Sequence, residues 1–266
     1  MVLEPSSPSW RLPPGVTRGL WEYAHSRQVA ESEDSYFAEH RLFAMDEEVI
    51  WRHLARRGFK AGTVVADLGC GAGRAIVPLA RLGLHGLAID LSLPLLQKVQ
   101  QKAQAEHLPI TCVQANLVEL DGIADQSVSV ALSLFSTLGM IRGHQHRLQA
   151  LQHTRRILRP GGVFVLHVHN LWFNLRDPAG PWWVFRQTAR AWLLRDSERG
   201  GKFFEYRGVP NLFLHVFTIG ELRSLLHRAG FRIVEQIPLD ERRYRPLKHA
   251  WCLGNWRANG WIVVCE

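Results

Sequence analysis

The middle of the chain alternates short apolar runs with segments in which apolar side chains recur at the spacing of a helix. Short apolar runs predict buried strands and the longer periodic segments predict helices, so this alternation indicates βαβ units and a parallel sheet. The five strands predicted here are Thr63–Leu68, Leu84–Asp90, Pro109–Gln114, Val128–Phe135 and Val163–His169. The helices predicted between them are Gly73–Arg81, a helix capped by Ser92 that runs to about Glu106, and His144–Leu158.

The alternation breaks after the fifth strand. Residues 171–217 form a connection far longer than the roughly 2–6 residues usual between such elements, so we expect an insertion there. Its pattern predicts a helix around Trp182–Leu194 and a hairpin of Lys202–Arg207 with Leu212–Phe217. Insertions of this kind lie at the substrate side of many α/β enzymes.

The two ends of the chain complete the predicted organisation. Thr218 is expected to cap a helix that Gly230 ends, and two final strands, Phe231–Ile237 and Gly260–Cys265, are expected to close the sheet as a pair. Residues 1–60 are predicted to be helical. The chain therefore divides into an N-terminal helical cap, residues 1–60, and a main domain, residues 61–266.

Composition excludes several classes of protein. Of 266 residues 47% are hydrophobic and only four are cysteine, which argues against a disordered chain and a disulfide scaffold. No cysteines are spaced as CxxC, so we predict no metal site. No apolar run approaches the length of a membrane span, and the N-terminal sequence lacks the basic and apolar regions of a secretion signal. We expect a cytoplasmic protein without membrane partners.

The charge is unevenly distributed. The formal net charge is +8, and residues 171–266 carry 15 basic against 9 acidic side chains. Arginine, which dominates the basic residues, suits bidentate recognition of phosphate or carboxylate. An anionic partner is one interpretation of this surplus, and an ordinary solvated surface is the other.

The most informative motif follows the first predicted strand. That strand ends in Asp67, and glycines stand at alternate positions after it, at Gly69, Gly71 and Gly73. Such glycines let the backbone pass close to a ligand before a helix begins. The dinucleotide spacing GxGxxG is not met, because its last position holds Arg74. The run instead resembles the S-adenosylmethionine site of class I methyltransferases.

Further motifs in the same order strengthen the resemblance. It implies that Asp90, at the end of the second strand, binds both ribose hydroxyls. It implies that Asn116, where the family usually has Asp, faces the adenine amino group, and that Phe135 lies beside the cofactor. The turn 158–162 also matches the family. The cofactor-binding residues implied are Asp67, Gly69, Cys70, Gly71, Gly73, Asp90, Leu91, Asn116, Leu117 and Phe135.

The resemblance also implies a fold and an activity. The fold is α/β, a doubly wound seven-stranded and mostly parallel sheet with an antiparallel last strand and helices on both faces. The activity is methyl transfer from S-adenosylmethionine, with S-adenosylhomocysteine as product. A cofactor-binding protein without transferase activity is disfavoured because the glycine loop is intact.

The motifs do not identify a catalytic residue. Displacement at a sulfonium methyl requires alignment and exclusion of water, and a general base only where the acceptor must lose a proton. Five histidines could reach the methyl group in this architecture: His144, His146, His167, His169 and His215. The chain lacks the Asp/Asn-Pro-Pro-Tyr/Phe motif of amino-group base methylation and the Pro-Cys of cytosine C5 methylation.

The acceptor is expected to bind between the insertion and the N-terminal helices, near Tyr36, Phe37 and Arg41. Trp182–Phe185 is either a lid over an apolar substrate or ordinary helix packing. We favour a small molecule with a free hydroxyl, amine or carboxylate. An RNA acceptor is the alternative, because segments 213–222 and 254–256 loosely resemble tRNA wobble-uridine carboxymethyl methyltransferases.

Overall fold

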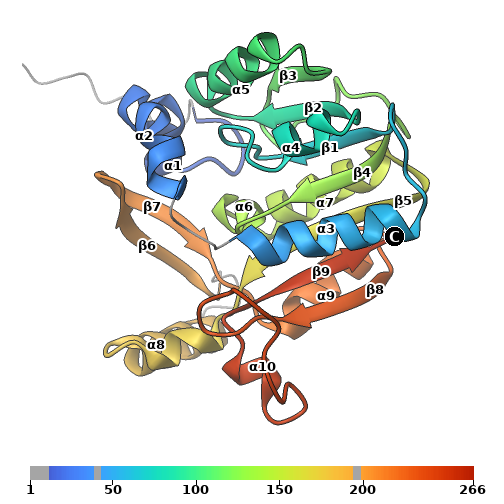
Figure 1. Ribbon diagram of the computed structural model, residues 1–266. Coiled ribbons are helices and arrows are strands. Elements are labelled where there is room, and N and C mark those ends of the chain that lie inside the picture. The colour runs from blue at the N-terminus through green and yellow to red at the C-terminus, as the bar shows by residue number, and fades with distance from the viewer. Residues whose placement is uncertain (1–11, 39–42, 194–198) are drawn as a thin grey trace, which may run out of the picture.

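The computed structural model describes residues 12–38, 43–193 and 199–266, and its centre is a seven-stranded sheet (Figure 1). The strands are β1 (Val64–Leu68), β2 (His85–Asp90), β3 (Ile110–Gln114), β4 (Val128–Ser133), β5 (Leu158–His169), β8 (Ile233–Pro238) and β9 (Gly260–Cys265). Their order is β3-β2-β1-β4-β5-β9-β8. Strands β1–β5 pair in parallel, and β9 runs antiparallel to both of its neighbours. The predicted fold class is confirmed.

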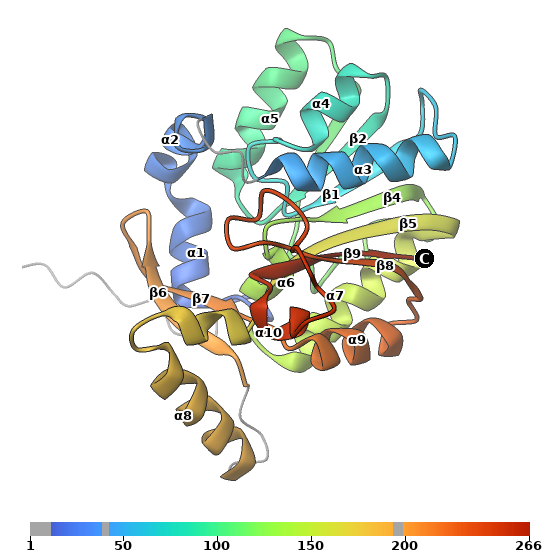
Figure 2. The ribbon, with the colours of Figure 1, turned by 60° about the horizontal axis from the view of Figure 1, so that its bottom comes forward.

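Helices cover both faces of this sheet (Figure 2). One face carries α3 (Ala44–Arg56), α4 (Ile76–Arg81) and α5 (Leu93–Ala105), and the other carries α7 (His144–Ile157) and α9 (Ile219–Arg228). In the central strand β1, Val65 packs into one core, whereas Ala66 and Leu68 pack into the other. A strand buried on both faces cannot alternate with polar residues.

Local signals set the ends of two helices as predicted. The Ser92 hydroxyl accepts a hydrogen bond from the Leu95 N–H at 3.4 Å, and the Thr218 hydroxyl accepts one from the Glu221 N–H at 3.2 Å. Gly230 follows the second of these helices with a φ of +85°, a conformation that glycine adopts without steric cost.

Three predicted boundaries are wrong by three residues or more. The second strand of the hairpin, expected to be Leu212–Phe217, is Val209–His215. The helix expected from Gly73 begins only at Ile76, because the left-handed φ of Gly71 and Gly73 is incompatible with a helix. The fifth strand begins at Leu158 rather than Val163, because Leu158 already pairs with Val128 before the register shifts. Three short helical elements had no recognisable pattern: α6 (Thr137–Met140), η3 (Trp172–Arg176) and α10 (Gly254–Arg257).

The insertion and the N-terminus meet over the carboxyl edge of the sheet. The insertion contains α8 (Gly180–Leu193) and a separate hairpin, β6 (Gly201–Tyr206) with β7 (Val209–His215). Helix α1 (Arg18–His25) packs so closely on β7 that a Cβ at Gly19 would lie 2.3 Å from the Asn211 carbonyl oxygen. Helix α2 (Arg27–Ala38) lies beside α5 (Figure 1). Segments nearly 200 positions apart thus share one wall.

Candidate active site

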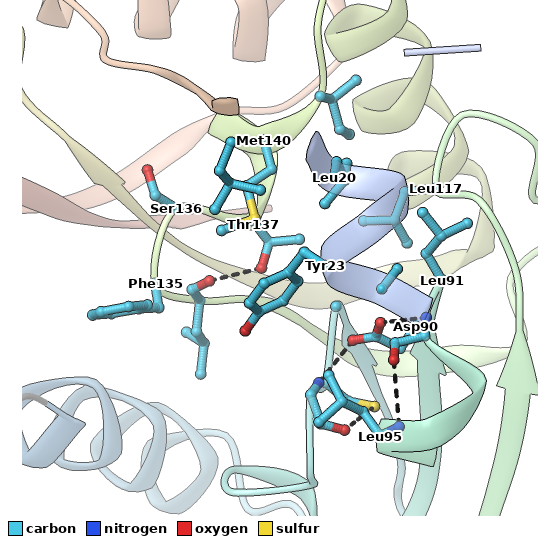
Figure 3. A pocket seen from close by; sticks show the side chains of 18 of the residues that line it. Leu20, Tyr23, Asp90, Leu91, Leu95, Leu117, Phe135, Ser136, Thr137 and Met140 are labelled. Atoms are coloured by element: carbon cyan, nitrogen blue, oxygen red, sulfur yellow. Dashed lines mark hydrogen bonds between the residues drawn. The ribbon is translucent and has the colours of Figure 1, made fainter. Parts of the chain in front are cut away.

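A cavity of about 490 Å³ opens at the carboxyl ends of β1 to β5 (Figure 3). Ligands of open α/β sheets bind at this edge, where neighbouring connections leave the sheet in opposite directions. In this sheet β1 has β2 on one side and β4 on the other, so the crevice lies beside β1. The cavity is within the size range of small-molecule sites.

The structure brings nine of the ten predicted cofactor residues to this cavity. Those that line it are Asp67, Gly69, Cys70, Gly71, Asp90, Leu91, Asn116, Leu117 and Phe135. Gly73 does not line it: its φ is +85°, and an added Cβ would lie 3.0 Å from the side chains of Val77 and Val99. Gly73 therefore packs the loop onto α4 and α5.

The glycine loop leaves no room for a side chain at Gly69. Gly69 has a φ of +80°, and an added Cβ would lie 2.3 Å from the Thr137 methyl group. Gly71 has a φ of +54° and faces the cavity, where a Cβ would lie 3.5 Å from a Glu33 carboxylate oxygen. The loop backbone itself therefore forms part of the cavity wall.

Asp90 connects the glycine loop to the next strand. One of its carboxylate oxygens accepts a hydrogen bond from the Gly71 N–H and the other from the Ser92 N–H, both at 2.8 Å (Figure 3). Burial raises the pKa of Asp90, and these N–H donors act against that rise. The result is a carboxylate held rigidly at the cavity wall.

Asp67 is a second buried carboxyl in the wall. Burial raises its pKa to about 7, although the nearby Arg74 guanidinium acts in the opposite direction. A carboxyl with this pKa changes charge near neutral pH. A cationic ligand group would favour its ionised form.

Asn116 is held in place by three hydrogen bonds. Its amide nitrogen donates to the Pro14 carbonyl at 2.9 Å and to the Glu119 carboxylate at 3.1 Å. Its carbonyl oxygen accepts from the Val118 N–H at 3.2 Å. That oxygen keeps a second lone pair, which is the acceptor that an adenine amino group requires.

The opposite half of the cavity comes from the N-terminal helices, the hairpin and the loop before β9. Figure 3 shows Tyr23 of α1 reaching between Phe135 and Asp90. Burial raises the pKa of both Tyr23 and Tyr206, so they are phenols rather than phenolates. The lining residues of this half include Leu20, Tyr23, Glu33, Phe37, Lys202, Phe204, Tyr206, Leu212, Leu214 and Arg243.

An ion pair joins the helices to the hairpin. Arg207, in the hairpin turn, pairs with Glu33 of α2, and its guanidinium also donates to the Val29 carbonyl at 2.8 Å and the Ser32 hydroxyl at 2.6 Å. The two charged side chains are almost fully buried. Sequence analysis missed Arg207 and Arg243, since no local motif marks either residue.

Of the five candidate histidines, only His169 lines the cavity. Its Nε2 lies 3.3 Å from an Arg243 guanidinium nitrogen, and burial lowers its pKa well below the usual value. The other four have partners elsewhere: Asp46 for His167, Glu221 for His215, Arg228 for His144 and the Arg142 carbonyl for His146.

The aromatic run of α8 is not a lid. Trp182 and Phe185 stack on each other at 5.6 Å, are 65% and 62% exposed, and do not line the cavity. Val184 is buried, and Trp183 packs against a small core of insertion residues. These contacts agree with the interpretation of ordinary helix packing.

The residues expected near the acceptor are partly at the cavity. Phe37 lines it, and Tyr36 packs edge-on against Phe37 and Tyr206. Arg41 lies outside the described residues.

The described residues contain neither a membrane-spanning helix nor a metal-binding cluster. None of their helices has the length and hydrophobicity needed to cross a membrane. Within the same ranges, no three His, Cys, Asp or Glu side chains are grouped so that they could hold a metal ion.

Residues 65–162 match the family model described as "Methyltransferase domain". Over 210 residues the chain is 26% identical to a ubiquinone biosynthesis O-methyltransferase of Rhodopseudomonas palustris, covering 77% of this chain and 72% of the relative. It is also 26% identical over 187 residues to the human probable tRNA methyltransferase 9B, covering 68% of this chain but only 37% of that protein. Other relatives, putative methyltransferases of Geobacillus and Bacillus subtilis, are matched over less than half of their length.

Solved structures with this fold include S-adenosylmethionine-dependent methyltransferases of Methanosarcina mazei and Clostridium acetobutylicum. The CcbJ methyltransferase of Streptomyces caelestis aligns with a TM-score of 0.63 at 20% identity, covering 91% of this chain and 98% of that one. The 1,6-didemethyltoxoflavin-N1-methyltransferase of Burkholderia thailandensis, solved with its substrate and S-adenosylhomocysteine, aligns with a TM-score of 0.58 at 19% identity, covering 88% and 81%. Likeness at these identities shows a shared fold.

Proposed function

Because the chain is an S-adenosylmethionine-dependent methyltransferase of the class I fold, we propose that it methylates a small molecule. The acceptor binds in the half of the cavity formed by the N-terminal helices, the hairpin and Arg243. The observation that carries this proposal is a cavity of about 490 Å³ whose wall on that side is formed by residues of α1, α2 and the hairpin. The buried pair of Glu33 with Arg207 ties the hairpin to α2 above the glycine loop.

We propose that the cofactor occupies the other half, and the residues there fit it. Asp90 supplies a carboxylate for the ribose hydroxyls, and Asp67 a carboxyl whose charged form a cationic amino acid moiety would favour. Leu91, Leu95 and Leu117 provide an apolar surface for the adenine ring beside Asn116. A Cβ at Gly71 would project into the cavity, so the backbone approach matches a ligand that passes close to the loop.

The cofactor supplies an activated methyl group, and this chain's residues align the acceptor with it and exclude water. Phe37 and Phe204 give the acceptor half apolar walls. No covalent intermediate with the protein is required. We therefore assign the lining residues positioning roles rather than a nucleophilic one.

The relatives support a small acceptor without deciding its identity. One has a name that refers to ubiquinone biosynthesis, and one solved structure contains 1,6-didemethyltoxoflavin. An RNA acceptor remains the second candidate, because of the similarity to probable tRNA methyltransferase 9B and the basic last third of the chain.

As part of this proposal, residues 1–60 form a cap on a domain of residues 61–266. We also propose a cytoplasmic location, since all four cysteines are free.

The test is transfer of a labelled methyl group. The protein is incubated with S-adenosylmethionine carrying a tritiated methyl group and, separately, with the low-molecular-mass fraction or the RNA fraction of a cell extract. Label in the small-molecule fraction that resists ribonuclease is the expected result. Label only in RNA would replace this proposal with the RNA alternative.

A further inference from the structure

Arg243 enters the acceptor half of the cavity from a surface loop. It has a φ of +61°, in the left-handed region that is costly for a residue with a Cβ. The turn is held by Asp240, whose carbonyl accepts from the Arg243 N–H at 3.1 Å and whose carboxylate accepts from the Tyr244 N–H at 2.9 Å. Eight other non-glycine residues of the described chain also have a positive φ, so what distinguishes Arg243 is its position in the cavity wall.

The Arg243 guanidinium lies beside aromatic rings. The charge of the buried Asp46 carboxylate acts on it from beyond ion-pair distance, and that carboxylate is hydrogen-bonded to His167. Its carbon is 4.9 Å from the centroid of the Phe135 ring, and one nitrogen is 3.3 Å from His169 Nε2. Among the residues that the structure describes, no carboxylate forms an ion pair with it. A largely buried charge without an ion-pair partner is costly, so the site favours a ligand that brings an anion.

The side chains of the acceptor half that could take up a proton are engaged by neighbours. Burial lowers the pKa of Lys202, and its nitrogen donates to the Asn174 amide oxygen at 2.8 Å. An arginine can only donate, so His169 Nε2 must accept from Arg243, and that nitrogen is not available to remove a proton.

The Glu33 carboxylate is occupied by Arg207. The tyrosines Tyr23 and Tyr206 are phenols, as described above. These residues therefore suit an acceptor group that is methylated without losing a proton better than they suit a hydroxyl group, which must lose one.

We propose that the methyl acceptor is the carboxylate of a small molecule and that Arg243 binds this carboxylate, an inference that rests on the function proposed above. A carboxylate oxygen forms the new bond to the methyl carbon, the bond from sulfur to that carbon breaks, and its electron pair remains on sulfur. The products are a neutral methyl ester and a thioether, and no proton is exchanged. The ester no longer pairs with Arg243, which favours its release.

Arg74 is a second cation of this wall, with a different neighbourhood. Its guanidinium carbon lies 3.0 Å from the centroid of Phe43 and 4.7 Å from that of Phe37. Arg74 directly follows the glycine loop. Burial lowers its pKa, and the carboxylates of Glu33 and Asp67 raise it. Because of this position, the carboxylate that Arg74 would bind is the one carried by the cofactor. The affinity of an Arg243 variant for S-adenosylhomocysteine distinguishes these sources of carboxylate.

The experiment measures the base lability of the transferred label. The full-length protein receives S-adenosylmethionine with a tritiated methyl group and the low-molecular-mass fraction of a cell extract, and the product is treated with alkali. A methyl ester releases volatile tritiated methanol, whereas methyl ethers and methylamines do not. Volatile label is expected. Label that enters small molecules but resists alkali would overturn the carboxylate while leaving the proposed function intact. The RNA fraction of the same extract is supplied in a parallel reaction, and label only in RNA would instead overturn the proposed function.

Arg243→Gln and Arg242→Gln form a matched pair from one loop. Arg242 is exposed and does not line the cavity. The Arg243 variant should lower kcat/KM for alkali-labile transfer on the order of 10- to 100-fold, the usual size of a charge-assisted contact. Its affinity for S-adenosylhomocysteine, measured by calorimetry, should stay at the wild-type value, which also shows that it folds. Equal kcat/KM in the two variants would contradict the role of Arg243, and a loss of cofactor affinity would assign its carboxylate to the cofactor.

Discussion

The two halves of the cavity are built in different ways. The proposed cofactor half consists of short segments that each follow one strand of the sheet, and its residues come from residues 67–135. The proposed acceptor half is assembled from α1, α2, the hairpin and a loop before β9, which are far apart in the sequence. The cofactor half should therefore keep its affinity for the cofactor when residues of the acceptor half are substituted. The acceptor half, which we call the assembled half, should lose its shape when the contacts between its segments are removed.

The largest expected effect tests the independence of the cofactor half. Gly71→Leu places a branched side chain at a φ of +54° in the cavity, toward the Glu33 carboxylate. Calorimetry should show the affinity for S-adenosylhomocysteine falling by more than about a hundredfold, because the side chain occupies ligand space and strains the loop. Gly122→Ala is the matched control, since nothing lies within 4 Å of its Cβ position. Wild-type affinity in the Gly71 variant would mean that the cofactor does not bind at this loop.

The next variant loosens the assembled half. Arg207→Gln removes one partner of the buried pair with Glu33 and should lower the free energy of unfolding by about 2–4 kcal/mol in denaturant titrations. It should also raise KM for the acceptor with little change in cofactor affinity. Arg18→Gln is the control, because its ion pair with Glu22 is exposed and is worth well under about 1 kcal/mol. Parallel losses of cofactor and acceptor binding would show that the halves are not independent.

Asp90→Ala sharpens the account of the cofactor half. The variant loses the proposed ribose contacts and the acceptor for the Gly71 N–H, so cofactor binding should weaken by about 1–3 kcal/mol in calorimetry. Asp121→Asn, on the exposed surface, should bind as the wild type does. Unchanged affinity in the Asp90 variant would place the ribose elsewhere.

The smallest effect concerns Asp67 and pH. Burial raises its folded-state pKa to about 7, so the folded protein holds this proton more tightly than the unfolded chain and loses stability as pH rises from about 4 to about 7. Asp67→Asn should therefore be more stable than the wild type at pH 8, on the order of 1–2 kcal/mol, and nearly equal to it at pH 4. Thermal or chemical unfolding at both pH values measures this difference, and a variant that is less stable at pH 8 would contradict the buried, uncompensated carboxyl.

The same residue gives a binding prediction of opposite sign. If the ionised form of Asp67 holds a cationic group of the cofactor, affinity should fall as pH drops below about 7, by up to about tenfold per pH step of one. The Asn variant should bind more weakly and show a flatter pH profile. A wild-type profile that is flat between pH 5 and pH 8 would exclude this contact.

The difference between the halves also explains what the sequence could predict. Strands such as β1 and β9 are buried on both faces, so their apolar runs identify them, and Ser92 and Thr218 mark helix starts by local hydrogen bonds. The cofactor residues follow such strands directly. Their positions in one cavity follow from the topology, although their contacts with the cofactor remain predictions.

The assembled half offered no comparable signal. Arg207 forms an ion pair with Glu33, which lies 174 positions earlier in the sequence. The Arg243 guanidinium packs over the Phe135 ring from a loop whose turn is held by Asp240. Neither contact has a period or a motif, because both depend on how the insertion and the N-terminal helices pack. The aromatic run at Trp182–Phe185 suggested a lid by composition alone, yet two of its rings face solvent. The sequence indicated that aromatic and basic residues line the acceptor half, but it did not identify which of them do so.

The most direct test of the account is a crystal structure of the protein with S-adenosylhomocysteine. The account predicts ribose hydroxyls on the Asp90 carboxylate, the adenine beside Asn116 and Leu117, and the thioether sulfur facing the space lined by Phe135, His169 and Arg243. That arrangement would aim the methyl group of the cofactor into the acceptor half. A ligand bound with its sulfur directed away from Arg243, or bound outside this cavity, would contradict the account.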